Sequence, residues 1–146
     1  MKLAPGGGTD AGAIKIKERR FCKVCPTIGI RATIRNTDSS QNKTMFIDDD
    51  ITQSSNGAHL CKSGYRTHVT CGFIRAFSGV GLRDLVATEM YSDHGDSGGP
   101  IYAYKQDFRT VSLNGILSIN QNLLSMITPI EIIREVLDIV PITIKQ

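Results

Sequence analysis

The sequence predicts an all-β fold, a sandwich or a barrel, that ends in one α-helix. Apolar and polar residues alternate along several short segments, which is the pattern of strands with one buried face. Turn-forming clusters such as Asn56-Gly57 separate these segments. A helical spacing of apolar residues is signalled near the end of the chain. Short strands separated in this way are typical of sandwiches and barrels.

The alternation is clearest in the segment 28–35, where Ile28, Ile30, Ala32 and Ile34 fall on one face. Arg31, Thr33 and Arg35 fall on the other face, so we expect a strand with one buried side. In order along the chain, the predicted strands are 13–17, 28–35, 44–47, 58–61, 69–77, 85–91, 101–105 and 111–119.

The predicted helix begins after Thr128, whose hydroxyl is placed to act as an N-cap. Pro129 suits the first helical position, and Glu131 would complete a capping box. Pro141 would end the helix. Its apolar face consists of Ile130, Ile133, Leu137 and Val140.

Composition bounds the class of protein. The chain has 146 residues, 40% of them hydrophobic and 21% charged, which fits one globular domain. A net charge of +3 is too small to indicate nucleic-acid binding, and the basic residues in 15–23 lack interleaved aromatics. No apolar stretch approaches the roughly 20 residues that a membrane span requires. The first residues lack the apolar core of a secretory signal.

The most informative motif is the run 95–100, Gly-Asp-Ser-Gly-Gly-Pro. A serine between glycines suits a nucleophile whose loop must also bind an oxyanion, because Gly95 has no Cβ and its backbone can turn an N–H toward a substrate. The alternative is a glycine-rich hairpin turn with a polar tip.

This run resembles the nucleophile motif of chymotrypsin-like serine proteases at all six positions. From about residue 56 to 140 the chain resembles their second β-barrel, most closely that of the streptogrisin and α-lytic protease branch. Cys61 and Cys71 are similar to the cysteines of that branch's disulfide hairpin. The segment 114–118 resembles the strand that pairs with substrate, and 127–139 resembles the last strand and closing helix.

The resemblance implies a chymotrypsin-like double β-barrel fold whose first barrel is largely missing. Residues 1–20 would be a remnant of the first barrel, 21–55 the connection and first strands of the second barrel, and 56–146 the second barrel with the nucleophile and the helix.

The resemblance also implies a serine endopeptidase that works through an acyl-enzyme and needs no cofactor or metal. Ser97 would be the nucleophile, and the N–H groups of Gly95 and Ser97 would form the oxyanion hole. Asp96 would pair with Lys62 to hold the loop in shape. Asp10 is similar to the triad aspartate, because 9–16 resembles the strand that carries it; the alternative is an acid in a glycine-rich turn.

The family's triad order is His, Asp, Ser, but His59, His68 and His94 all follow Asp10. His94 would lie at the rim of the site, and the other two would be surface or pairing residues. Loss of the histidine costs about a millionfold in turnover, so we expect this chain to be close to inactive. The expectation is a truncated copy of a longer precursor, and the alternative is an inactive homologue that acts as a binding module.

The residues that would line the substrate pocket are unusual for the family. Tyr91 stands six residues before Ser97, where the pocket base is expected. Ser118 fits one wall, but Asn120 stands where a glycine usually keeps the pocket open. A shallow or partly filled pocket is therefore expected, without preference for Lys or Arg.

Cys22 and Cys25 form a C-x-x-C motif. Together with Cys61 and Cys71 they could bind zinc in a small zinc-stabilised β domain, although the spacing of the second pair is unlike a zinc knuckle. A local bridge, or partners in a missing half, is favoured. For the full-length form the resemblance implies a secreted monomer that acts on protein or peptide substrates, with no nucleic-acid or membrane partner.

Overall fold

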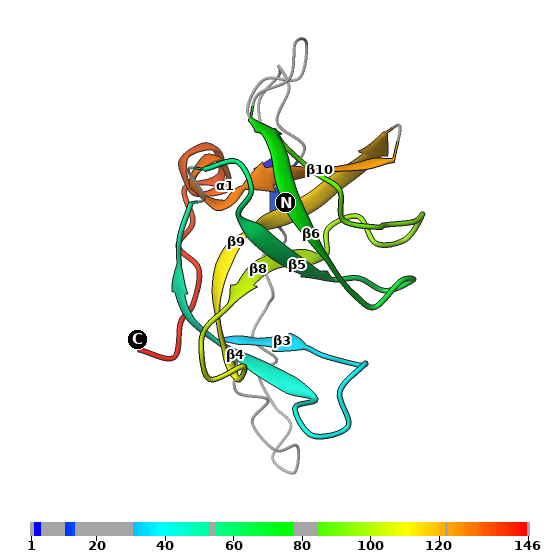
Figure 1. Cartoon of the computed structure of the whole chain (residues 1–146). Coiled ribbons are helices and arrows are strands. Elements are labelled where there is room, and N and C mark those ends of the chain that lie inside the picture. Colours follow the sequence, from blue (N-terminus) through cyan, green and yellow to red (C-terminus); the bar gives the residue numbers. More distant parts are fainter. Residues whose placement is uncertain are drawn as a thin grey trace.

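The computed structural model describes residues 2–3, 11–13, 31–52, 55–77, 85–121 and 123–145 (Figure 1). The described elements are β1 (Lys2–Leu3), β2 (Gly12–Ala13), β3 (Thr33–Arg35), β4 (Thr44–Asp50), β5 (His59–Ser63), β6 (Val69–Phe77), β7 (Val86–Thr88), β8 (Pro100–Tyr104), β9 (Thr110–Gln121), β10 (Leu124–Pro129) and α1 (Ile130–Leu137). The all-β prediction with one helix near the end of the chain is confirmed.

Six strands close into a barrel. Their order is β10-β7-β6-β5-β8-β9, and pairing of β9 with β10 joins the two ends. Every neighbouring pair in this ring is antiparallel. β4 adds to β9 in parallel, and β3 pairs with β4, so the sheet continues past the barrel (Figure 1).

The apolar side chains fall into separate clusters. One cluster fills the barrel with residues from all six of its strands, among them Leu60, Ile74, Ile101 and Ile127. A second packs β3 and β4 against the barrel wall. In β3 the alternation predicted for 28–35 holds over its described part, because Ala32 and Ile34 are buried while Arg31 and Arg35 are exposed. Residues 28–30 lie outside the described ranges.

Several strand boundaries differ from the sequence prediction. β4 and β9 run further than expected, whereas the predicted strand 85–91 is reduced to Val86–Thr88. The chain leaves the sheet after β7 because residues 89–99 form the loop that carries the serine motif. Residues 14–17 of the first predicted strand lie outside the described residues.

The helix starts and ends differently from the prediction. Pro129 is the N-cap, and no side chain caps the helix. Thr128 instead belongs to β10, and its buried hydroxyl lies 2.5 Å from the hydroxyl of Ser118 on β9. The prediction of a capping box is therefore wrong. The Thr128 hydroxyl, which was expected to cap the helix, lies instead against Ser118 inside the barrel.

At its other end the helix stops at Leu137, not at Pro141. Asp138 adopts the left-handed conformation at φ 50°, and its N–H donates to the carbonyl of Arg134. Ile130, Ile133 and Leu137 are buried as predicted, whereas Val140 lies beyond the helix and is 65% exposed. The described part of the chain has no helix long and apolar enough to cross a membrane.

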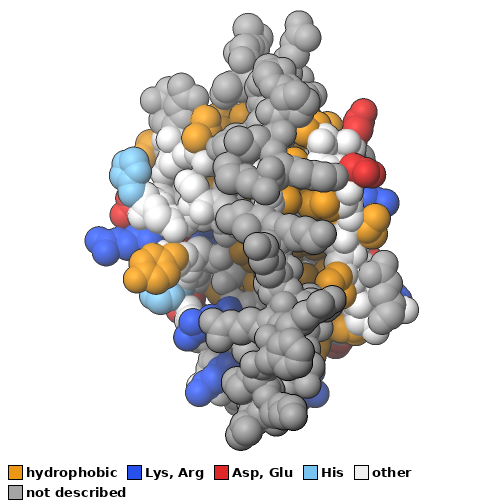
Figure 2. Space-filling view, turned by 180° about the vertical axis from the view of Figure 1, so that it is seen from behind, with side chains coloured by type: hydrophobic (Ala, Val, Ile, Leu, Met, Phe, Trp, Pro, Cys, Tyr) orange, Lys and Arg blue, Asp and Glu red, His pale blue; other side chains and the backbone are white. Residues whose placement is uncertain are grey.

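Some large apolar side chains remain on the surface. Figure 2 shows several of them on the face opposite to that in Figure 1. The exposed large apolar residues of the described ranges include Phe46, Ile51, Ile119 and Leu123. Isolated exposed apolar side chains are normal in soluble proteins, so their exposure alone carries no functional meaning.

Candidate active site

Ser97 is exposed on the loop between β7 and β8. Two glycines give this loop its shape, since Gly95 has φ 103° and Gly98 has φ 82°. Side chains with a Cβ rarely adopt these conformations. The loop is anchored to β9, because the Gly98 N–H donates to the carbonyl of Leu117 at 2.7 Å and the Leu117 N–H donates to Gly99 at 2.9 Å.

Some backbone N–H groups of this loop have hydrogen-bond acceptors within the described structure, and others do not. The N–H of His94 donates to Asp93 Oδ1 at 2.7 Å, and that of Asp96 donates to the Asp93 carbonyl at 3.1 Å. The N–H groups of Gly98 and Gly99 also have carbonyl acceptors. Among the described residues, the N–H groups of Gly95 and Ser97 have no such acceptor. These two alternate groups flank Asp96 and are available to bind an external oxygen.

Asp96 is buried beneath this loop. Its Oδ1 accepts the N–H groups of Arg66 at 2.7 Å and Thr67 at 3.0 Å. Its Oδ2 accepts the Thr67 hydroxyl at 2.5 Å and the Asp93 N–H at 3.1 Å. Burial raises the pKa of this carboxyl, but the hydrogen bonds from Thr67, Asp93 and Lys62 together lower it by more, so its pKa lies well below the ordinary value.

Lys62 supplies the opposite charge. Its Nζ lies 3.0 Å from Asp96 Oδ2, and neither side chain has any solvent exposure. The same ammonium donates to the Thr67 hydroxyl at 2.5 Å. The contact that the sequence resemblance implied between Lys62 and Asp96 is therefore present. It joins β5 to the serine loop across 34 residues of sequence.

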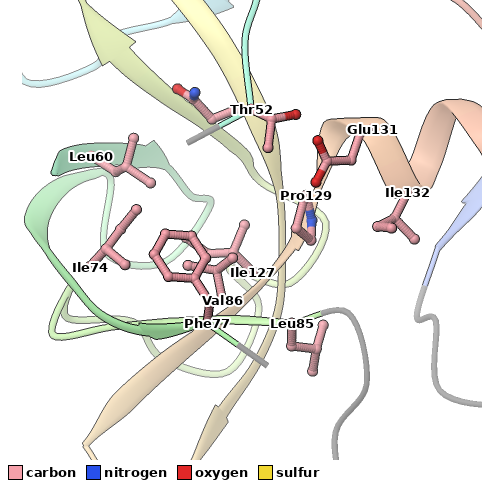
Figure 3. Close-up of a pocket in the computed structure, with 11 residues that line it drawn as sticks. Thr52, Leu60, Ile74, Phe77, Leu85, Val86, Ile127, Pro129, Glu131 and Ile132 are labelled. Carbon is pink, nitrogen blue, oxygen red and sulfur yellow. The ribbon is translucent and has the colours of Figure 1, made fainter. Parts of the chain in front are cut away.

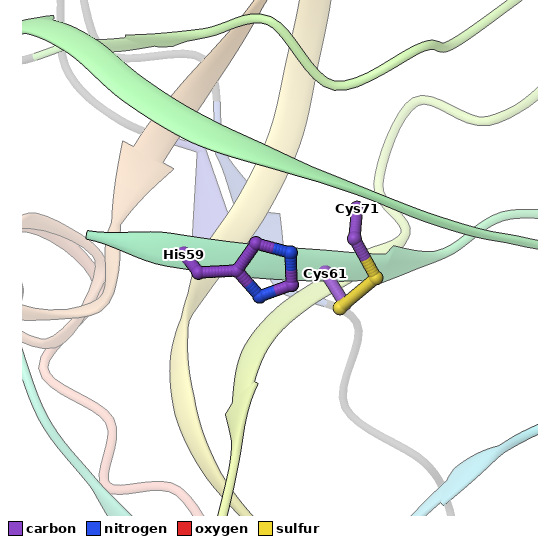
Figure 4. Close-up of side chains that lie close together, drawn as sticks. All are labelled: His59, Cys61 and Cys71. Atoms are coloured by element: carbon purple, nitrogen blue, oxygen red, sulfur yellow. A yellow bond between two sulfur atoms is a disulfide. The ribbon is translucent and has the colours of Figure 1, made fainter. Parts of the chain in front are cut away.

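Lys62 is flanked by a disulfide that bridges β5 and β6. Cys61 and Cys71 lie opposite each other in the sheet and are bonded. Figure 4 shows His59 beside this bridge. The three residues are close enough to suggest a metal site, but the disulfide has consumed both thiols, so they cannot supply thiolate ligands. Cys22 and Cys25 lie outside the described residues.

An open strand edge begins beside the serine loop. β9 pairs with β8 as far as Ile116, and with β10 as far as Gln121. Beyond Leu117, the edge of β9 that faces away from β10 has no neighbouring strand within the described ranges. Residues 119–121 therefore present backbone groups that an extended peptide can pair with. Most of the predicted substrate strand 114–118 does not, because residues 115–117 have neighbours on both edges.

Two of the three predicted pocket residues, Ser118 and Asn120, lie on β9 at the start of this edge, whereas the carbonyl of Tyr91 accepts the Thr70 hydroxyl of β6 at 2.6 Å. Tyr91 is 65% exposed, and Ser118 is buried against Thr128. The side-chain amide of Asn120 donates to the carbonyl of Ser92 at 2.6 Å. This bond joins the segment before the serine loop directly to β9.

A second layer of hydrogen bonds lies behind that contact. The hydroxyls of Ser92 and Ser125 are 2.6 Å apart, and the Ser125 hydroxyl also donates to the carbonyl of Met90 at 2.6 Å. Both serines are buried, at 2% and 0% exposure. The segment 90–92 is thus bonded to β9 through Asn120 and to β10 through Ser125. Sequence reasoning missed Ser92 and Ser125, because each is an ordinary serine whose partner is distant in sequence.

None of the three histidines hydrogen-bonds Ser97 in the described structure. His68 Nδ1 lies 2.7 Å from the Thr37 hydroxyl, and the ring of His59 packs edge-on against Phe73. His94 is exposed beside Gly95. Figure 2 shows histidine side chains at one edge of the surface. Asp10 lies outside the described residues, so its predicted role stays a prediction.

The structure is similar to solved bacterial serine proteases. Chymotrypsin from Cellulomonas bogoriensis matches with a TM-score of 0.61 and 22% identity, over 78% of this chain and 63% of that chain. The chain has a chymotrypsin-like fold. Protease A from Thermobifida fusca matches with a TM-score of 0.61 and 19% identity, over 77% of this chain and 61% of that one. A glutamic acid-specific serine protease gives 0.61 and 22%, over 82% and 63%.

This chymotrypsin-like chain thus spans about three fifths of the length of these structures. No family model matches it. No curated protein sequence matches it either. At these identities the similarity shows the fold, and the chemistry has to be argued from the site itself.

Proposed function

We propose that the chain carries the nucleophile and oxyanion site of a serine endopeptidase. The pattern of N–H groups around Ser97 is the observation that supports this most strongly. The loop bonds the N–H groups of His94, Asp96, Gly98 and Gly99 internally and leaves those of Gly95 and Ser97 without an acceptor in the described structure. Both groups are exposed and lie on either side of Asp96, next to the Ser97 hydroxyl, so they can donate to the oxygen of a carbonyl that this hydroxyl attacks.

In the proposed reaction, a peptide lies in extended form along residues 119–121 and presents a carbonyl to Ser97. The Ser97 Oγ adds to the carbonyl carbon and its proton passes to a base, while the developing oxyanion accepts the N–H groups of Gly95 and Ser97. The C–N bond then breaks, the amine leaves with a proton, and water hydrolyses the acyl-serine. The buried Asp96–Lys62 pair keeps the loop in the shape that this step needs.

The base is the incomplete part of this mechanism. All three histidines of the chain are exposed, and none hydrogen-bonds Ser97 in the described structure. Asp10 is proposed as the residue that would orient a histidine, on sequence resemblance alone. We therefore expect very slow acylation by the chain itself, and faster acylation when an imidazole is supplied.

The test is labelling by a fluorophosphonate probe, with and without free imidazole in the buffer. The expected result is that Ser97 is labelled in the wild-type chain, that imidazole increases the rate, and that Ser97→Ala abolishes labelling. Ser55→Ala is a matched control because it removes an exposed serine hydroxyl from the turn that precedes β5. Equal labelling of the wild type and Ser97→Ala, or no labelling under either condition, would contradict the proposal.

We further propose that the substrate residue that supplies the attacked carbonyl is small, such as Gly or Ala. The proposal is supported by the bond from Asn120 to Ser92, which crosses between 90–92 and β9 where we place the side chain of that substrate residue. Ser125 holds Ser92 in this position from β10. Competition against the probe tests this with peptide boronic acids that carry a methyl or a benzyl group at that residue.

The methyl compound should compete better with the wild-type chain. Asn120→Gly should narrow this preference by about tenfold or more, the size of effect that pocket volume produces. Asn120→Asp removes the donor but keeps the volume, so it separates the hydrogen bond from steric filling. An unchanged preference in Asn120→Gly would refute the assignment.

The second candidate is a non-catalytic binding module that uses the open edge of β9 to hold an extended peptide. The three exposed histidines, none of which bonds Ser97 in the described structure, favour it. It is the conclusion if no labelling occurs while peptides still bind. In either case the Cys61–Cys71 disulfide supports a working environment that is oxidising, such as the cell exterior.

A further inference from the structure

Three residues with metal-binding side chains share one face of the β5–β6 hairpin. Leu60 projects from β5 into the barrel core, where it packs with Ile74 (Figure 3). Because side chains alternate along a strand, His59 and Cys61 project from the opposite face of β5. Cys71 of β6 lies directly opposite Cys61 and shares that face. The three side chains are therefore neighbours outside the barrel core and outside the serine loop.

The ligand atoms of these side chains are already close together. A nitrogen of the His59 ring and the sulfurs of Cys61 and Cys71 all lie within 4.8 Å of one another. Figure 4 shows the imidazole extending along β5 toward the disulfide, and Phe73 packs against this ring with 5.1 Å between the ring centroids. Tetrahedral zinc, with bonds of about 2.3 Å to sulfur and about 2.1 Å to nitrogen, holds such atoms roughly 3.5–3.8 Å apart. Small side-chain rotations would therefore surround an ion once the two sulfurs are no longer bonded to each other.

The state of the disulfide decides whether these ligands are available. Cys71 is exposed, whereas Cys61 is 1% exposed, so a reductant reaches the Cys71 sulfur first. A thiolate of a dithiol reductant attacks that sulfur, and Cys61 leaves as a thiolate. The second thiol of the reductant then displaces Cys71 and closes a disulfide within the reductant. The chain has gained two electrons and two protons, and the reductant has lost them.

Charge and surroundings indicate which ion the reduced site would take. The side chain of Cys61 packs in an apolar cluster with Met45 and Tyr102, where an uncompensated charge is unfavourable. Two thiolates and a neutral imidazole carry two negative charges, so a divalent ion gives a neutral centre, whereas Cu(I) leaves one negative charge. Thiolate and imidazole ligands suit zinc, while Mg²⁺ and Ca²⁺ prefer oxygen ligands.

We propose that the reduced chain binds one Zn²⁺ ion through His59, Cys61 and Cys71. The two thiols lose their protons on binding, and water completes the tetrahedron. The ion then joins β5 to β6 in place of the disulfide. This ligand set differs from a four-cysteine site, because it uses His59 and needs neither Cys22 nor Cys25. It is independent of the chemistry at Ser97.

The test measures zinc binding by the whole chain carrying Cys22→Ser and Cys25→Ser, which remove the other two thiols. A water-soluble phosphine reduces the bridge and becomes a phosphine oxide with oxygen from water. Competition with a chromophoric chelator gives the zinc affinity, and Co²⁺ in place of Zn²⁺ reveals thiolate ligands by charge-transfer absorption. The reduced chain should bind one ion and show this absorption. The oxidised chain should bind about 100-fold more weakly or less, since it lacks both thiolates.

A histidine variant tests the third ligand. His59→Ala should weaken zinc binding about tenfold or more, because even the loss of a group that only orients a ligand has an effect of that size. His68→Ala is the matched control, since His68 is also exposed and lies between β5 and β6, but its Nδ1 is 2.7 Å from the Thr37 hydroxyl. This control should leave the zinc affinity unchanged. Equal binding by the oxidised chain, unchanged binding by His59→Ala, or no binding after reduction would overturn the proposal.

Circular dichroism covers the case in which reduction unfolds the chain. The three ligands come together only in the folded hairpin, so zinc binding is coupled to folding. Excess Zn²⁺ should then restore the β-sheet spectrum of the reduced chain, and His59→Ala should need about tenfold more zinc for the same recovery. A reduced chain that stays unfolded in excess Zn²⁺ would also overturn the proposal.

Discussion

The buried ion pair beneath the serine loop allows a quantitative prediction. Lys62→Met keeps the long apolar stem of the side chain but removes the ammonium. Asp96 then loses its only charged partner in the described structure, although it keeps its bonds from Arg66, Thr67 and Asp93. Both side chains are fully buried. Breaking a buried pair by removing one partner costs about 3–5 kcal/mol, and the retained bonds favour the lower end of that range.

The measurement is urea unfolding at neutral pH with the disulfide intact. Arg75→Met is the matched control, because Arg75 pairs with Glu89 on the surface with the two side chains 58% and 36% exposed. An exposed pair contributes about 1 kcal/mol or less. If Lys62→Met lowers the free energy of unfolding by less than about 1 kcal/mol, the reasoning is refuted, because the buried pair would then contribute no more than an exposed pair.

The same pair determines how stability depends on acid. The folded pKa of Asp96 is lower than its unfolded value. Its contribution to stability is therefore fully present above the unfolded pKa of about 4 and is lost as the pH falls toward the folded pKa. In Lys62→Met the folded pKa rises and this contribution shrinks. The stability difference between wild type and variant should accordingly narrow below about pH 4, and a difference that widens there would contradict the argument.

Three further predictions use the same unfolding measurement. Replacing Cys61 and Cys71 by Ala removes a bridge with a sequence separation of 10, and loop-closure entropy predicts a loss of about 2.7 kcal/mol; a change near zero would show that the bridge constrains little. Leu123→Gly should stabilise the chain by roughly 0.5–1 kcal/mol, because Leu123 is 92% exposed and has φ 68°, which glycine adopts without strain; a loss of stability would contradict this. Gly98→Ala should cost about 1–2 kcal/mol through its φ of 82° alone, since an added Cβ there meets nothing within 4 Å; a neutral effect would show that the loop readjusts freely.

The strands were predictable where one face is buried along their length. Ala32 and Ile34 are buried between exposed arginines, so their alternation was readable before any tertiary contact was known. The helix start was not predictable in the same way. Thr128 has the right residue type for a cap, but the pairing of β10 with β9 brings its hydroxyl to Ser118. At Thr128, tertiary packing therefore overrides the local preference of threonine for the N-cap position.

Part of the candidate site was likewise predictable from the sequence, and part of it was not. The run 95–100 is contiguous, so its chemistry could be inferred from residue types and order. The contact of Asn120 with Ser92 spans 28 residues, and that of Ser92 with Ser125 spans 33. Neither has a local pattern, and only the folded barrel brings the partners together. The same is true of Thr67, whose hydroxyl joins Lys62 to Asp96.

The free edge of β9 has a consequence for the behaviour of the protein in concentrated solution. A closed barrel protects its strands from pairing with other molecules, but residues 119–121 have no neighbouring strand on one side in the described structure. A strand edge from a second copy can occupy the same groups as an extended peptide. Self-association and peptide binding should therefore compete. Peptide binding per chain should weaken reversibly as the protein concentration rises.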